Sequence, residues 1–387
     1  MRTRQQFGVL AAWLVMSAPL GPSSARAADD PPRLGLWVRQ DGVLVKGGKA
    51  YRGIGVNYFN CFARTLADPN DTSYDDGFGA LADLGIPFAR FMCGGFWPVE
   101  NTLYLESKEQ YFQRLDAVVK SAETHGIGLI PSLFWNMNTV PDLVGEPCDQ
   151  WGNPRSKTHE YMRTYTRDVV TRYRRSPAIW GWEFGNEYNL AADLPNAAEH
   201  RPPVWPDLGT ATSRSERDEL THEMIRTAFA EFAREVRRYD QRRLITTGNG
   251  FPRPSAWHQR TEGSWTQDTP AQYAAMLLGD NPDPVNVVSV HAYEDRDRIP
   301  ATMAICRQAK RPLFVGEFGV PGAGTPETER EFGEFVALLE REGVPLAALW
   351  VYDFGGQDET WNVTATNARA YQLLAIAEAN TRLRAAG

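Results

Sequence analysis

Two glutamates occupy positions from which they could act as a catalytic pair. Glu187 ends the run Trp180-Gly-Trp-Glu-Phe-Gly-Asn-Glu187, and Glu317 lies in Leu313-Phe-Val-Gly-Glu-Phe-Gly319. Both runs are β-branched or aromatic and bounded by glycine or proline, which is typical of buried parallel strands with a carboxylate at the C-terminal end. One carboxyl group that donates a proton and a second that attacks carbon are what double displacement at a glycosidic bond requires.

These two runs belong to a series of eight, separated by segments with helical spacing. The clearest helical segment, which ends at His125-Gly126, has its apolar residues three and four positions apart. The predicted strands are 51–59, 86–93, 126–135, 178–187, 243–248, 285–293, 313–317 and 344–352. Other predicted helices are 157–174, 213–239, 272–278, 302–310, 326–343 and 368–384. Eight strands that alternate with helices predict the α/β class and a (β/α)₈ barrel, preceded by a hairpin at 36–48 that turns at Asp41-Gly42.

Three long loops follow strands three, four and five of this predicted barrel. They cover residues 136–155, 190–212 and 251–269, and they are rich in proline, glycine and tryptophan. Barrel enzymes build their sites on the face where the strands end. We therefore expect these loops to form the walls of a cleft around the two glutamates.

The first 27 residues have the layout of a secretory signal peptide. Arg2 and Arg4 precede an apolar run that is too short to span a membrane, and Ala25-Arg26-Ala27 offers a cleavage site. We expect a secreted (extracellular or periplasmic) protein whose residues 28–387 form a single catalytic barrel domain. Cleavage would remove three of 41 basic residues, leaving 38 against 48 acidic residues and a net charge of −10. This charge disfavours nucleic acid and anionic membranes as partners and suits a neutral substrate.

Four cysteines, Cys61, Cys93, Cys148 and Cys306, are spaced without a CxxC pair. In an exported protein one or two disulfides are possible, and three connectivities remain open if all four pair. Their spacing favours disulfides over a metal site. We expect neither a metal nor an organic cofactor, no membrane span in the mature chain, and a monomer.

Further candidate site residues fall at the ends of other predicted strands: Arg90 in Phe-Ala-Arg-Phe, Asn186 before Glu187, His291-Ala-Tyr293, and Trp350. In this order the motifs resemble those of glycoside hydrolase family 5, in the clan of retaining (β/α)₈ glycosidases that includes cellulases and β-mannanases. The resemblance runs over nearly the whole mature chain, from Arg52-Gly-Ile-Gly-Val-Asn57 to Trp350.

The resemblance implies a role for each of these residues. Glu187 is similar to the family's acid/base and Glu317 to its nucleophile. Asn186 would donate to the sugar 2-hydroxyl, Arg90 would hold Glu317 ionised, and the Tyr293 hydroxyl would hydrogen-bond Glu317. His291 would line the sugar subsite and Trp350 would form its floor.

The chain departs from the family pattern at two places. Tyr188 follows Glu187 where many members have proline, and strand three ends in Leu133-Phe-Trp-Asn136 where many have histidine. Trp135 and Asn136 are expected to replace the contact of that histidine, which the mannan-cleaving branch of the family also lacks. Trp97, Trp265 and Trp361 follow strands or lie in long loops, where they could stack on sugar rings, whereas Trp180 and Trp182 are expected to pack in the core.

Any single glutamate at a strand end is more often a structural ion-pair partner than a catalyst. Glu183 lies deeper on its strand than Glu187 and is expected to be a core carboxylate whose hydrogen bonds are satisfied. The joint pattern predicts a retaining endo-β-1,4-glycanase that acts on mannan or cellulose-type chains, with a polysaccharide or oligosaccharide as its partner. Two alternatives stay open: an exo-acting β-glycosidase with one end of the cleft closed, and a non-catalytic carbohydrate-binding barrel.

Overall fold

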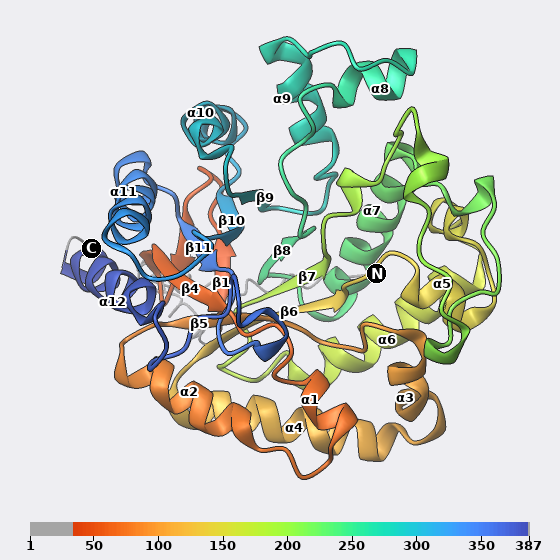
Figure 1. Cartoon of the computed structure of the whole chain (residues 1–387). Helices are drawn as coiled ribbons and strands as arrows, with labels where there is room; N and C mark the ends of the chain where they lie inside the picture. Colours follow the sequence, from red (N-terminus) through yellow and green to blue (C-terminus); the bar gives the residue numbers. More distant parts are fainter. Residues whose placement is uncertain (1–33, 386–387) are drawn as a thin grey trace, which may run out of the picture. The chain divides into compact units, whose positions relative to one another are not determined.

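The computed structural model describes residues 34–385, in which eight parallel strands are ringed by helices (Figure 1). The predicted signal peptide, residues 1–27, lies outside these described residues. All eight predicted strands are present: β4 Gly53–Asn57, β5 Phe88–Met92, β6 Gly128–Phe134, β7 Gly181–Gly185, β8 Leu244–Thr246, β9 Val288–Ala292, β10 Leu313–Phe318 and β11 Leu346–Leu349. The prediction of a (β/α)₈ barrel is confirmed.

The sheet runs in the order β8-β7-β6-β5-β4-β11-β10-β9, so that β8 and β9 are its two edges. These edges are joined by a few hydrogen bonds in place of a regular ladder. The Val287 amide donates to the Ile245 carbonyl at 3.1 Å, and the Ile245 amide donates to Asn286 Oδ1 at 2.8 Å. The barrel is therefore nearly closed, and the C-terminal ends of all eight strands meet at one mouth.

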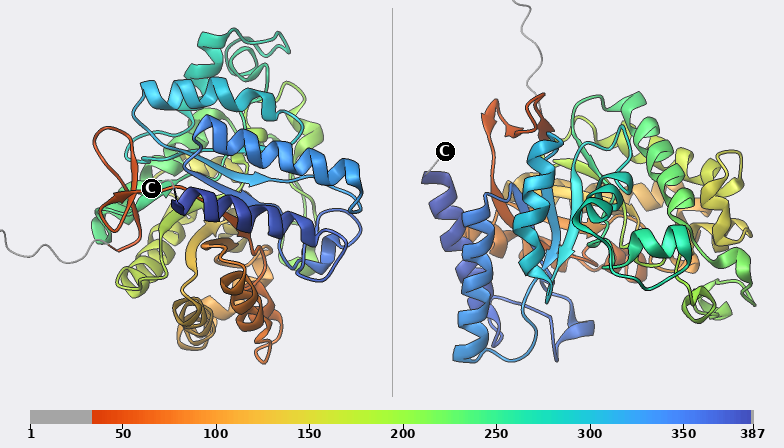
Figure 2. Two further views of the ribbon diagram at one scale, coloured as in Figure 1. Left: turned by 90° about the vertical axis from the view of Figure 1, so that its left-hand side faces the viewer. Right: turned by 90° about the horizontal axis from the view of Figure 1, so that it is seen from above.

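The helices are α1 Ala63–Ala67, α2 Ser73–Asp83, α3 Thr102–Glu106, α4 Lys108–His125, α5 Thr139–Val144, α6 Lys157–Tyr173, α7 His222–Tyr239, α8 Ala256–Glu262, α9 Pro270–Gly279, α10 Ile299–Gln308, α11 Pro326–Glu342 and α12 Ala370–Ala385. In Figure 2, α10, α11 and α12 lie next to one another on one side of the barrel. One boundary prediction is wrong: α7 begins at His222 and not near residue 213, because the Thr221 side chain caps it by accepting from the Met224 amide.

The predicted N-terminal hairpin is present and has one strand more than expected. Strands β1 (Leu36–Val38) and β2 (Leu44–Lys46) are antiparallel, with Gly42 at φ +85° in their turn, and β3 (Lys49–Ala50) continues the sheet. Leu36 and Leu44 pack with Trp180 against the apolar layer inside the barrel. The small sheet thus covers the end of the barrel where the strands begin, and Trp180 packs in the core as predicted.

All four cysteines are buried and free, so the disulfides that an exported protein could form are absent from the described residues. Within residues 34–385, no helix combines the length and the apolar character needed to cross a lipid bilayer.

Candidate active site

Glu187 and Glu317 face each other across the mouth of the barrel. Glu317 lies in β10, and Glu187 follows the end of β7 by two residues. One carboxylate oxygen of each and a ring nitrogen of His291 all lie within 4.8 Å of one another. The Glu317 side chain is only 6% exposed, whereas that of Glu187 is 34% exposed. The two carboxyl groups therefore share one site but differ in their access to water.

The backbone at Glu187 adopts the left-handed conformation, with φ +53°, which is uncommon for a residue other than glycine. Its amide donates to the Gly248 carbonyl at 2.8 Å. Gly248 has φ +75°, and a Cβ atom there would lie 1.9 Å from the Gly185 carbonyl oxygen, so only glycine fits at this crossing of β7 and β8. The strained backbone turns the carboxylate of Glu187 into the mouth, as is common at functional sites.

The Arg90 guanidinium is the centre of a buried network of four side chains. Its Nε donates to Glu183 at 2.6 Å, its Nη1 to Glu317 and to Asn57 Oδ1, both at 2.9 Å, and its Nη2 to Asn186 Oδ1 at 2.9 Å. Burial disfavours the charge, but the two carboxylates outweigh this and raise the pKa of Arg90. Because Arg90 orients the Asn186 oxygen toward itself, the Asn186 amide nitrogen is left available to a ligand.

Glu183 differs from the fully satisfied core carboxylate that the sequence suggested. One of its oxygens is bound by Arg90, while the other, Oε2, has no hydrogen-bond partner among the described residues. Burial raises the pKa of Glu183, and the charge of Arg90 only partly opposes this. The positive charge of Arg90 is therefore shared between Glu183 and Glu317 and is not reserved for Glu317.

Strand β9 and the residue that follows it supply a partner to each glutamate. The Tyr293 hydroxyl donates to Glu317 Oε2 at 2.6 Å, and burial together with the charge of Glu317 raises the pKa of Tyr293 well above its usual value. His291 Nδ1 lies 2.9 Å from Glu187 Oε1 and 3.5 Å from Glu317 Oε2. His291 therefore lies between the two carboxylates, within 3.5 Å of an oxygen of each.

The pKa of Glu187 is set by opposing effects. Burial raises it, but the hydrogen bond and charge interaction with His291, helped by the charge of Arg90, outweigh burial and hold the pKa of Glu187 below its usual value. In the ligand-free protein Glu187 is thus biased toward the carboxylate.

A cavity of about 390 Å³ opens beside Glu187, and it contains several of the predicted site residues. It is lined by Phe96, Trp135, Asn136, Met137, Asn186, Glu187, Leu190, Ala191, Leu194 and His200. Trp135 stacks with Trp350 at 6.1 Å between ring centroids, and the Arg90 guanidinium lies 4.5 Å from the Trp135 ring. The cavity thus combines apolar walls with a few polar groups, as binding sites for small molecules and sugars do.

Two of the three loops that were expected to form walls line this cavity, and the third does not. All lining residues except Phe96 come from the loops after β6 and β7, and Phe96 comes from the loop after β5, whereas none comes from residues 251–269. Arg253, in this third loop, instead donates to the carbonyls of Leu190 and Ala192. The loop after β8 supports the wall from outside the cavity.

The other tryptophans considered in the sequence analysis differ in burial and in their distance from the cavity. Trp97 does not line the cavity, but its ring lies 4.8 Å from that of Phe96, which does. Trp361 packs against Tyr293 at 5.1 Å, Trp182 is fully buried as predicted, and Trp265 is 58% exposed.

Glu187, His291 and Glu317 also form the group that could hold a metal ion, since each offers a ligand atom within 4.8 Å of the others. However, both oxygens of Glu317 already accept hydrogen bonds, from Arg90 and Tyr293. The buried positive charge of Arg90 beside the group further disfavours a cation. The arrangement suits two carboxyl groups acting directly on a ligand.

Several contributors were not identified from the sequence. Asn57, at the end of β4, donates to the Gly316 carbonyl at 2.9 Å while accepting from Arg90. The motif that ends at Asn57 and the position of this residue at a strand end could have indicated its role. Phe96, Leu194 and His200 carry no such signal, because they lie in irregular loops whose path only the folded chain defines.

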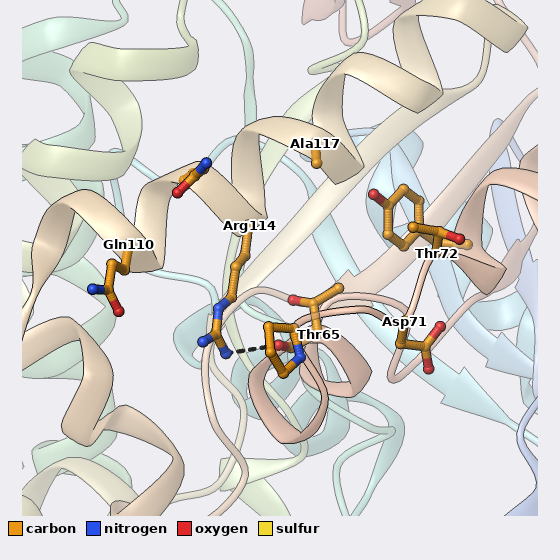
Figure 3. Close-up of a pocket in the computed structure, with 9 residues that line it drawn as sticks. Thr65, Asp71, Thr72, Gln110, Arg114 and Ala117 are labelled. Carbon is orange, nitrogen blue, oxygen red and sulfur yellow. Dashed lines mark hydrogen bonds between the residues drawn. The ribbon is translucent and has the colours of Figure 1, made fainter.

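A second cavity, of about 510 Å³, lies between α4 and the segment before α2 (Figure 3). It shares no lining residue with the cavity beside Glu187. Its arginine, Arg114, donates to the backbone carbonyls of Thr65 and Leu66. The charge of Arg114 is thus already engaged in joining α4 to α1.

The family model for cellulase, glycosyl hydrolase family 5, matches residues 52–356. The chain belongs to glycosyl hydrolase family 5. The resemblance identified from the motifs is therefore confirmed. The matched range contains every predicted site residue from Arg90 to Trp350.

Relatives of this family-5 protein include fungal mannanases. The chain is 32% identical over 139 residues to the probable mannan endo-1,4-beta-mannosidase F of Aspergillus flavus, covering 30% of each chain. It is 36% identical over 96 residues to the mannan endo-1,4-beta-mannosidase F of Aspergillus fumigatus, covering 23% of this chain and 22% of the relative. The matched stretches thus span less than a third of these relatives.

Solved structures support the fold over a longer range. The endo-1,4-beta-mannanase of Rhizomucor miehei superimposes with a TM-score of 0.64 at 16% identity, covering 90% of this chain and 99% of that one. An exo-beta-1,4-mannosidase from an Opitutaceae bacterium gives 0.60 at 16% identity, covering 89% of this chain and 63% of that one. At this identity the similarity shows a shared barrel fold.

The buried network predicts a large effect of removing Arg90. In Arg90→Met, Glu183 and Glu317 lose their counter-charge, and the free energy of unfolding should fall by about 3–5 kcal/mol. Adding Glu183→Gln should recover part of the loss, because Glu183 is fully buried and Arg90 supplies its ion pair. Urea denaturation of the three proteins measures this.

Arg382→Met, which removes a partly exposed pair with Glu340, is the matched control and should change stability by less than about 1 kcal/mol. An Arg90→Met protein as stable as the control would contradict the view that Arg90 neutralises two buried carboxylates.

Proposed function

We propose that this protein is a secreted, retaining endo-β-1,4-mannanase in which Glu317 is the nucleophile and Glu187 the acid/base. The observation that carries the proposal is the separation of the two carboxylates, with oxygens within 4.8 Å of each other at the mouth of a barrel. Retaining glycosidases hold their carboxyl groups about 5–5.5 Å apart, whereas inverting enzymes need about 6.5–9.5 Å. Secretion rests on the leader-like composition of residues 1–27.

In the first step, a Glu317 oxygen forms a bond to the anomeric carbon while the bond to the leaving oxygen breaks. Glu187 gives its proton to that oxygen, so the leaving chain departs as a neutral alcohol. In the second step, Glu187 takes a proton from water, the water oxygen bonds to the anomeric carbon, and Glu317 is released. Arg90 and Tyr293 hold Glu317 in place for attack through one hydrogen bond to each oxygen.

The lowered pKa of Glu187 in the ligand-free protein suits the second step, in which Glu187 must be ionised. The first step needs the protonated form. A bound sugar would exclude water from the 34% of the Glu187 side chain that is exposed, and this desolvation raises the carboxyl pKa. The same residue can therefore serve as acid with substrate bound and as base afterwards.

Mannan is favoured over cellulose by two observations. The curated relatives are named as mannan endo-1,4-beta-mannosidases. In addition, Trp135 and Asn136 line the cavity at the end of β6, where many family members have histidine. The acidic balance of the chain is compatible with a neutral polysaccharide.

Product analysis tests the substrate and the mode of attack. The wild-type enzyme should release a ladder of oligosaccharides from soluble β-1,4-mannan, with slower release of reducing ends from a soluble cellulose derivative. Mannose as the sole product would favour the exo-acting alternative. Binding of mannan without any hydrolysis would favour the non-catalytic barrel.

Azide tests the assignment of the acid/base. Glu187→Ala should lower kcat on an aryl β-mannoside with an activated leaving group by about 10²–10⁴-fold, because no group then activates water. Added azide needs no base, so it should restore turnover and give a mannosyl azide of retained configuration. Glu317→Ala is the matched control and should form no product of retained configuration. Failure of azide to restore Glu187→Ala would refute the acid/base role.

The pH profile tests the contact with His291. Activity falls as the pH rises through the pKa of Glu187, because the acid loses its proton. Replacing His291 with leucine removes the hydrogen bond and charge that favour the carboxylate, so the pKa of Glu187 should rise and the alkaline limb of kcat/KM should move to higher pH. His291→Asn, which can keep a donor near Glu187, should move it less. If the alkaline limb of kcat/KM in His291→Leu stays at the wild-type pH, His291 does not lower the pKa of Glu187.

A further inference from the structure

The outer rim of the cleft carries an exposed aromatic surface that lies outside the proposed catalytic centre. Trp205 is 49% exposed, and Val99 and Val204 beside it are 48% and 39% exposed. Large apolar side chains exposed together are uncommon on a soluble protein and usually mark a binding surface. We define Trp97, Val99, Val204 and Trp205 as the rim patch.

The rim patch is continuous with the catalytic cavity through a series of ring contacts. Trp135 lies 4.8 Å from Phe59, Phe59 lies 6.3 Å from Phe96, and Phe96 lies 4.8 Å from Trp97. Trp97 then lies 4.9 Å from Trp205. A row of packed aromatic rings therefore leads from Trp135 to the outer loop after β7.

The turn that presents Trp205 is held firmly on both sides. The Trp205 amide donates to Thr210 Oγ1 at 2.6 Å, and Gly209 lies so close to η1 (Pro98–Asn101) that a Cβ atom there would be 3.0 Å from Pro98. Arg214 binds both oxygens of Asp142 in α5 at 2.7 Å and also donates to the Pro203 carbonyl at 3.1 Å. A tryptophan held in place while half exposed loses little conformational entropy when it binds a ligand.

The position of the cavity indicates which part of a sugar chain would reach the rim patch. Glu187 and Asn186 line the cavity, whereas Glu317, Tyr293 and Trp350 do not. Because the acid protonates the leaving oxygen, the sugars beyond that oxygen occupy the space beside Glu187. This step rests on the proposed function.

We propose that Trp205, together with Trp97, forms an outer subsite that binds the leaving-group end of an extended β-1,4-linked hexose chain. The apolar C–H faces of pyranose rings stack on indole rings, and the uncharged side chains of the rim patch suit an uncharged polysaccharide. Trp205 contacts no reacting atom in this arrangement; it determines how tightly long chains bind and which bond in them is cleaved.

Kinetics with a short and a long substrate test the outer subsite. An aryl β-mannobioside has no sugar on the leaving side, so kcat/KM for Trp205→Ala should equal that of the wild type. With soluble mannan, KM should rise about tenfold at unchanged kcat, and products should shift in size. Trp205→Phe, which keeps a flat ring, should recover most of the affinity. Calorimetric titration with mannohexaose should show the same loss of affinity.

Trp265→Ala is the matched control, because Trp265, at 58% exposed against 49% for Trp205, belongs to the loop that does not line the cavity. It should leave both substrates unaffected. Unchanged KM on mannan and unchanged mannohexaose affinity in Trp205→Ala would overturn the inference. The same holds if Trp265→Ala loses as much affinity, if Trp205→Ala loses as much kcat/KM on the aryl substrate, or if Trp205→Ala changes the oligomeric state. Inactivity of the wild type on both substrates would instead count against the proposed function, and mannohexaose titration would still decide the subsite.

Discussion

The structure depends most on the need to neutralise Arg90, a positive charge with no exposed surface. An unpaired charge in the interior would cost several kcal/mol, which is a large share of the stability of a folded domain. The guanidinium is satisfied by side chains from three other strands: Asn57 on β4, Glu183 on β7 and Glu317 on β10. The planar guanidinium group of Arg90, which lies on β5, therefore fixes the relative positions of four strands at the mouth of the barrel.

The same network gives the two candidate catalytic carboxylates different environments. Glu317 accepts from Arg90 and Tyr293 and is nearly buried, whereas Glu187 has His291 as its partner and remains one-third exposed. Two carboxyl groups with such different surroundings can take different roles at one pH. The proposed mechanism needs this asymmetry, because one group must stay ionised while the other exchanges a proton in each half of the reaction.

The sequence was sufficient to predict the strands, because period and composition are local signals, and the resemblance to family 5 identified the functional residues at their ends. Arg90, Asn186, His291 and Tyr293 all lie around the glutamates as the strand order required. The ion pair between Arg90 and Glu183 was not predictable. The alternation of side chains along β7 places Glu183 on the same face as Glu187, but it does not show that the Arg90 guanidinium also contacts a carboxylate deeper in the barrel than Glu317. Loop contacts were also beyond prediction: residues 251–269 looked like a cleft wall by composition, yet they support the neighbouring loop from behind.

Partly buried arginines also hold the loops in place, by donating to backbone carbonyls. Arg253 donates to the carbonyls of Leu190 and Ala192, and Arg214 joins Asp142 of α5 to the Pro203 carbonyl. Irregular segments have backbone oxygens that no helix or strand satisfies, and a guanidinium with five donors can satisfy several at once. The long loop after β7 is thereby joined to α5 and to the loop after β8. Such a loop can hold an exposed tryptophan in a fixed orientation far from the reacting atoms, which a flexible loop could not do.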